Sequence, residues 1–159
     1  IAQGAGRVTH AIGKIGDIFS HRGITHLHKG KSDADLAEHL VRLGREVEPG
    51  SLTFANFVEF DTNFGHRRDI PGYAAQLEWF DRVAGRFLEA LGPGDLAIFT
   101  ADHGNDPSWH GTDHTRERVA VLGHGVGPRE IGLVGFSDIG ASVMAHLGLP
   151  MPDHGRSFL

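Results

Sequence analysis

Residues 95–104 read DLAIFTADHG, an apolar stretch that turns polar immediately after Thr100. The run from Leu96 to Thr100 is short, apolar and preceded by turn residues, which is typical of a buried strand. Asp102 and His103 follow it directly. In α/β proteins the carboxyl ends of strands are where ligands bind. This stretch therefore predicts both a sheet strand and a functional loop.

The segments before this stretch predict a repeated strand and helix order. From Asp69 to Leu91 the apolar residues recur at helical spacing with charges on other faces, and Gly92-Pro93-Gly94 ends the pattern. Leu52 to Phe60 is dense in Phe, Val and Thr and predicts a buried strand. Further upstream, a short strand is expected at 8–12, and a helix at 33–48 with Ser32 as its N-cap.

The segments after it complete the pattern. Residues 101–117 are polar and predict a loop, a third strand fits Arg118 to Leu122, and a final helix runs from Asp138 to Leu147, with Ser137 as its cap. Strands that alternate with helices predict an α/β fold with a mostly parallel sheet sandwiched by helices.

The composition excludes several classes of function. The 159 residues include 20 acidic and 15 basic side chains, for a net charge of −5, which argues against nucleic acid or an anionic membrane as a partner. There is no cysteine, so disulfides, thiolate ligands and a cysteine nucleophile are excluded. No apolar run approaches the ~20 residues that span a bilayer.

Acidic and histidine side chains gather beyond the predicted strand ends. We expect five metal ligands there: Asp61, His66, Asp102, His103 and His114. A mixed oxygen and nitrogen set suits Mn²⁺ or Zn²⁺ better than Ca²⁺. Five ligands exceed one tetrahedral site but suit a pair of metals, which is typical of phosphoryl transfer or hydrolysis.

Other polar residues have plainer interpretations. Asp69 is a predicted helix cap, and Asp106 and Asp113 are predicted turn residues. Lys14, in a glycine-flanked turn, either holds a substrate phosphate or is simply solvated. His110 is left open, and the remaining histidines are interpreted as surface or packing groups: His10, His21, His26, His28, His39, His124, His146 and His154.

The motifs TADHG at 100–104 and GTDHTRE at 111–117 resemble the metal-binding core of the alkaline phosphatase superfamily. Within it, the chain resembles the phosphopentomutase family along nearly its whole length and in the same order. The further matching segments are GKIGDIF at 13–19, NFVEFD at 56–61, GHRRD at 65–69, FSDIG at 136–140 and GRSFL at 155–159.

This resemblance implies a cytoplasmic manganese enzyme that interconverts ribose or deoxyribose 1-phosphate and 5-phosphate. Its intermediate would be a phosphothreonine primed by a sugar bisphosphate. Asp61, His66 and His114 would hold one metal, Asp102 and His103 would hold the other, and Lys14 would lie near the substrate phosphate.

The family's nucleophilic threonine, a further aspartate ligand and the cap domain have no counterpart in this sequence. The resemblance therefore implies that residues 1–159 are the C-terminal portion of the catalytic core, lacking its N-terminal strands, inactive alone, and completed by the N-terminal segment of the same protein. Two alternatives stay open. One is another enzyme of the superfamily, such as a phosphatase or a phosphoglycerate mutase that needs no bisphosphate cofactor. The other is a non-catalytic metal-binding remnant or subunit.

Overall fold

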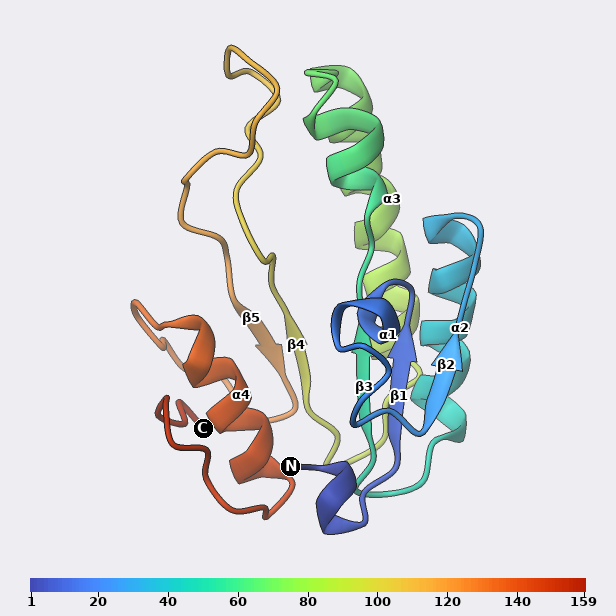
Figure 1. Cartoon of the computed structure of the whole chain (residues 1–159), viewed down its shortest axis with the longest axis vertical. Coiled ribbons are helices and arrows are strands. Elements are labelled where there is room, and N and C mark those ends of the chain that lie inside the picture. The colour runs from blue at the N-terminus through green and yellow to red at the C-terminus, as the bar shows by residue number, and fades with distance from the viewer.

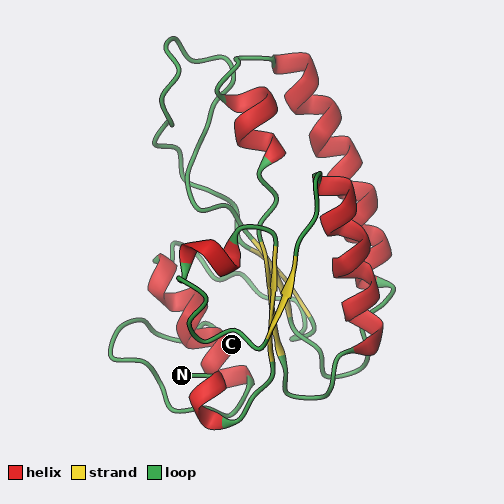
Figure 2. Ribbon diagram, turned by 45° about the vertical axis from the view of Figure 1, so that its right-hand side comes forward, coloured by secondary structure: helices red, strands yellow, loops and turns green.

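The computed structural model describes residues 1–159 as an α/β protein built around a parallel sheet. Its strands are β1 (Thr9–Ile12), β2 (His26–His28) and β3 (Leu52–Ala55), in the order β2-β1-β3. The helices α2 (Asp33–Glu46) and α3 (Ile70–Leu88) cover one face, whereas α4 (Phe136–His146) and the short α1 (Ile15–Ile18) lie on the other (Figures 1 and 2). The predicted α/β class, with a parallel sheet between helices, is confirmed.

The core sits between β1 and α2. Ile12 is completely buried and packs with three leucines that recur along α2, Leu36, Leu40 and Leu43. Both predicted caps at the starts of the long helices are present, since Ser32 accepts a hydrogen bond from the backbone of Asp35 and Asp69 accepts one from Gly72. The core is small, with 22 of 159 residues buried, and several large apolar side chains remain exposed. None of the helices is both long and apolar enough to cross a membrane.

The two strands that follow β3 differ from the prediction in their pairing, and the second also differs in where it begins. A second, two-stranded sheet pairs β4 (Ala97–Phe99) with β5 (Leu122–His124) in antiparallel fashion. The strand expected at 118–122 therefore begins only at Leu122, and it does not extend the parallel sheet. A strand extends only where a neighbouring strand can form hydrogen bonds with it, and the three residues of β4 pair only with residues 122–124.

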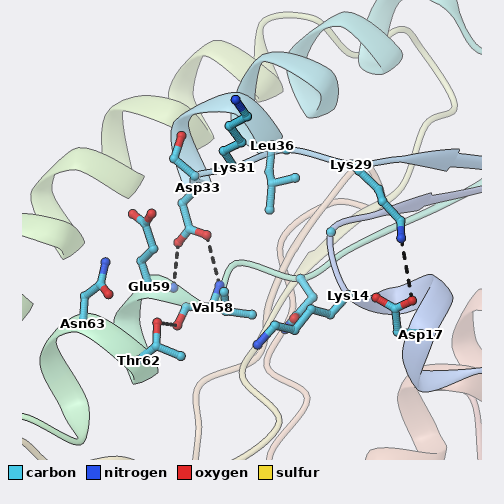
Figure 3. Close-up of a pocket in the computed structure, with 14 residues that line it drawn as sticks. Lys14, Asp17, Lys29, Lys31, Asp33, Leu36, Val58, Glu59, Thr62 and Asn63 are labelled. Atoms are coloured by element: carbon cyan, nitrogen blue, oxygen red, sulfur yellow. Dashed lines mark hydrogen bonds and ion pairs between the residues drawn. The ribbon is translucent and has the colours of Figure 1, made fainter.

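The segment after β3 also differs from the prediction. β3 ends at Ala55 rather than continuing to Phe60, and residues Phe60–Gly65 form a π-helical turn, η2. The buried carboxylate of Asp33, at the start of α2, accepts the backbone N–H groups of Val58 and Glu59 (Figure 3). These two groups are therefore unavailable to a sheet ladder, and the chain turns into η2.

Three short elements form where the sequence predicts no helix or strand, and the last helix begins earlier than predicted. The strand β2 and the helix α1 lie within residues 13–31, and a 3-10 turn covers Gln3–Ala5. The last helix, α4, begins at Phe136 instead of Asp138. Its N-cap is Gly135 rather than Ser137, because the carboxylate of Asp138 accepts the backbone N–H of Gly135 from within the first turn.

Candidate metal centre

Asp61 is the centre of the polar cluster. It lies in η2, where the tight turn also brings His66, the residue that ends η2, back toward it. The Nε2 atom of His66 is 3.1 Å from one carboxylate oxygen of Asp61, and the Nε2 atom of His114 is 3.3 Å from the other. Asp61 is about a quarter exposed, with 28% of its side-chain area accessible, so that solvent or a ligand can still reach it.

His103 and His114 approach Asp61 from the long loop after β4. Their rings stack with centroids 3.8 Å apart, and donor atoms of Asp61, His103 and His114 all lie within 4.8 Å of one another. An isolated antiparallel bridge joins Gly104 to Thr115, with the backbone N–H of Thr115 donating to the carbonyl of Gly104. This bridge closes the loop and so sets the two histidines side by side, although eleven positions separate them in the sequence.

Arg68 fastens this loop to η2. Its guanidinium donates to the carbonyl oxygens of Gly65, Asp106, Gly111 and Asp113 and to the side-chain oxygen of Asn105. Arg68 has a φ of 54°, which is unusual for a residue other than glycine and costs on the order of 1–3 kcal/mol. The five hydrogen bonds hold it in that conformation.

Replacing Arg68 with lysine is expected to weaken the binding of a divalent metal, probed with Mn²⁺, by about 10- to 100-fold, the usual effect of losing an outer-shell partner. An ammonium group lacks the planar fork that reaches several carbonyls at once. Binding is measured by the free Mn²⁺ signal in electron paramagnetic resonance, with amide exchange at residues 104–115 as a second readout. The matched control is Arg67→Lys, at an exposed neighbouring position. Equal affinities for the two variants would contradict this role for Arg68.

Hydrogen bonds orient the cluster. The side-chain amide of Asn105 donates to Asp61, and the Nδ1 atom of His66 donates to the carbonyl of Thr112, which directs the Nε2 atom of His66 toward Asp61. Partial burial raises the pKa of Asp61, but the amide of Asn105 and the neighbouring imidazoles together outweigh burial and hold that pKa below its usual range. Asp61 is therefore ionised at neutral pH.

The five predicted ligands are thus not equivalent in the structure. Asp61, His66, His103 and His114 come together. The carboxylate of Asp102 is 75% exposed and lies 3.7 Å from the Nε2 atom of His103, outside the group centred on Asp61. Sequence reasoning missed Asn105 and Arg68. Both act through contacts made across about 40 positions of sequence. The segment GHRRD at 65–69 contains Arg68 but does not indicate its contacts.

Lys14 lies in a separate pocket of about 340 Å³. Figure 3 shows its ammonium group directed into the pocket toward Val58 and Thr62, whereas Lys29 turns to Asp17, with which it forms an ion pair at 3.9 Å. The ion pairs of the chain include none with Lys14. The pocket also reaches Thr62 and Asn63 of η2, the same turn that carries Asp61.

The donor set of the cluster suits a divalent metal. It combines one ionised carboxylate with imidazole nitrogens, and the other ring nitrogens of His66 and His103 are hydrogen-bonded to backbone carbonyls. This is the usual outer-shell arrangement around Zn²⁺ and related ions. A cation held there could polarise a phosphoryl oxygen and activate an attacking oxygen.

The sequence of this chain is similar to those of known proteins. The metalloenzyme superfamily matches residues 5–151. A phosphopentomutase of Rhizobium leguminosarum bv. trifolii is 53% identical over 157 residues, which cover 97% of this chain and 39% of that relative. A phosphopentomutase of Agrobacterium fabrum is 49% identical over 158 residues, covering 98% of this chain and 39% of the relative. The chain spans about 39% of the length of the curated relatives it matches. By the extent of the family match, the chain belongs to the metalloenzyme superfamily.

Proposed function

We propose that the chain holds its divalent metal through Asp61, His66 and His114, with Asp102 and His103 serving a second ion. The imidazoles of His66 and His114, each beside one carboxylate oxygen of Asp61 at 3.1 and 3.3 Å, support the first set. The short distance between Asp102 and His103 supports the second, since a rotation of the exposed Asp102 side chain would aim both donors at one point. Mixed carboxylate and imidazole ligation favours Mn²⁺ or Zn²⁺.

We further propose that this chain is part of a phosphopentomutase, which interconverts ribose or deoxyribose 1-phosphate and 5-phosphate through a phosphorylated threonine primed by a sugar bisphosphate. The observation that carries this proposal is the identity of about half of all positions with phosphopentomutases over 97% of the chain. The metal cluster supports it, because phosphoryl transfer depends on neutralising charge on the phosphoryl oxygens.

Each part of this chain then has a task in the reaction. The bound metal ions would act as Lewis acids on the phosphoryl group. Asn105 and Arg68 hold the ligands in place, so that little reorganisation is needed as charge develops. Lys14 binds the substrate phosphate as a point charge in the pocket beside η2.

The catalytic threonine, a further aspartate ligand and the cap domain would come from a separate segment of the same protein, and the chain alone would not turn over substrate. Exposed apolar side chains support a covering partner. Leu122 of β5, Leu133 and Phe136 are each more than 60% exposed. A covering partner would remove these apolar side chains from water, which is favourable.

A chimera tests the proposed activity. The matching 157-residue segment of the Rhizobium leguminosarum phosphopentomutase is replaced by this chain, and interconversion of ribose 1-phosphate and 5-phosphate is measured. We expect activity within about tenfold of the parent enzyme, because one factor of ten corresponds to only about 1.4 kcal/mol of barrier. The isolated chain, assayed in parallel with Mn²⁺, is expected to be inactive.

The controls separate the alternatives. A chimera that carries Asp61→Asn should lose activity while keeping its fold, and a Lys14→Gln chimera should show a raised KM. A chimera that binds Mn²⁺ but has no activity would favour the non-catalytic metal-binding interpretation. A chimera active only on other phosphate esters would favour a different enzyme of the superfamily. Mutase activity in the isolated chain would overturn the proposed role of the separate segment.

A further inference from the structure

Four histidines form a second cluster, away from the candidate metal centre. His10 of β1 lies beside His26 of β2 in the sheet register, His28 lies two positions along the same strand, and His39 projects from α2. The rings of His26 and His28 stack against His10 with centroids 5.0 and 5.4 Å away, and His39 lies 5.4 Å from His28. Parallel register places His10, His26 and His28 on one face of the sheet.

His10 presents an unsatisfied nitrogen to this cluster. The residue is only 8% exposed, and its Nε2 atom is buried without a hydrogen-bond partner. The Oε2 atom of Glu48 lies 3.6 Å from it, beyond hydrogen-bonding distance. A buried polar atom in this position loses water without gaining a partner, a cost that a bound cation removes.

The other ring nitrogen of His10 is already engaged. Its Nδ1 atom lies 3.1 Å from the Nε2 atom of His28. When Nδ1 carries the ring proton and donates a hydrogen bond to His28, the lone pair of His10 is on Nε2, on the side of the Glu48 carboxylate. This is the arrangement in which ligating histidines are usually found, with the second nitrogen donating to an outer-shell acceptor.

The separation between His10 and Glu48 matches a shared metal ion. Two ligands about 2.0–2.1 Å from a tetrahedral Zn²⁺ lie about 3.4 Å apart, close to the 3.6 Å between Nε2 and Oε2. His26 lies on the same side of the sheet as His10, its partner in the strand register, with the two rings stacked 5.0 Å apart. Both Glu48 and His26 are exposed and free to rotate, whereas His10 is fixed by burial.

We propose that His10 Nε2, Glu48 and His26 bind an imidazole-preferring divalent cation such as Zn²⁺, with His28 as the outer-shell partner of His10. The site joins β2, the edge strand of the parallel sheet, to the turn that follows α2. Its role is structural, because a cation there ties an exposed sheet edge to the loop at residues 47–51.

Zinc titration by calorimetry tests this site in a chain that carries Asp61→Asn and His114→Gln, so that the candidate metal centre is disabled. We expect one Zn²⁺ to remain bound per chain. His26→Gln and Glu48→Gln, added singly to this background, should each weaken binding at least tenfold. His124→Gln, an exposed histidine on β5, is the matched control and should leave the affinity unchanged.

Each other outcome overturns the proposal. The absence of zinc binding in the double variant would do so, as would an affinity indifferent to both His26→Gln and Glu48→Gln. The cluster could instead hold only a proton between His10 and Glu48. In that case nuclear magnetic resonance would show a titration of His10 that depends on Glu48, without any zinc binding. Because the substituted side chains are exposed, circular dichroism should report an unchanged fold in every variant.

Discussion

Replacing Asp61 with asparagine is expected to weaken Mn²⁺ binding by more than about 100-fold, beyond the range typical of outer-shell losses. The carboxylate is the one ionised ligand that faces both His66 and His114, and its low pKa keeps it charged at neutral pH. An amide supplies a weaker, neutral oxygen in its place. Electron paramagnetic resonance of free Mn²⁺ measures the change directly, independently of any activity.

The matched control is Asp113→Asn, the same substitution at an exposed position next to His114. Asp113 contributes only its backbone carbonyl to the site, where it accepts from Arg68, so its side chain is expected to be dispensable. An unchanged Mn²⁺ affinity in Asp61→Asn, or an equal loss in both variants, would show that the cluster around Asp61 is not the metal centre.

The second large effect concerns Asp33 and pH. Burial raises the pKa of this carboxyl to about 6, although N–H donors from Val58, Glu59 and Gln76 oppose the shift. Since the folded pKa exceeds the unfolded value of about 3.9, the native state holds the proton more tightly. The contribution of Asp33 to the stability of the folded state is therefore fully present below about pH 4 and is lost as the pH rises to about 6. The free energy of unfolding should therefore fall by about 2–3 kcal/mol over that window.

Asp33→Asn isolates this contribution, because asparagine does not titrate and the other groups cancel in the difference between the two proteins. Urea unfolding of both proteins at pH 4, 5, 6 and 7 should show the wild type losing stability relative to the variant as pH rises. Asp81→Asn, on the exposed side of α3, should show no such trend. A wild type that instead gains relative stability with pH would mean that the three N–H donors outweigh burial at Asp33.

Local chemistry explains which elements could be predicted from sequence. α2 and α3 were predicted with their caps because an amphipathic repeat and a side-chain cap both lie within a few residues. Strand ends were predicted poorly, because a strand extends only as far as its partner. β5 therefore begins at Leu122, and β3 ends at Ala55.

The candidate site divides in the same way. The sequence identifies the aspartates and histidines as candidate metal ligands from their residue type and their position after predicted strands. Their geometry depended on the bridge between Gly104 and Thr115 and on the hydrogen bonds of Arg68, which join parts of the chain distant in sequence. Asn105 was missed for that reason. His10 and His26, interpreted from sequence as packing or surface groups, become neighbours only through the register of β1 and β2.

Periodicity, capping and residue type act within short stretches, so the amino-acid sequence is enough to predict the α/β class, the long helices and the chemical character of the loop at 101–117. The folded chain was needed to show which donors converge on Asp61, that Asp102 stands apart from them, and that a second group of imidazoles surrounds His10. Convergence depends on loop closure and strand register, and both are set by contacts between residues far apart in the chain.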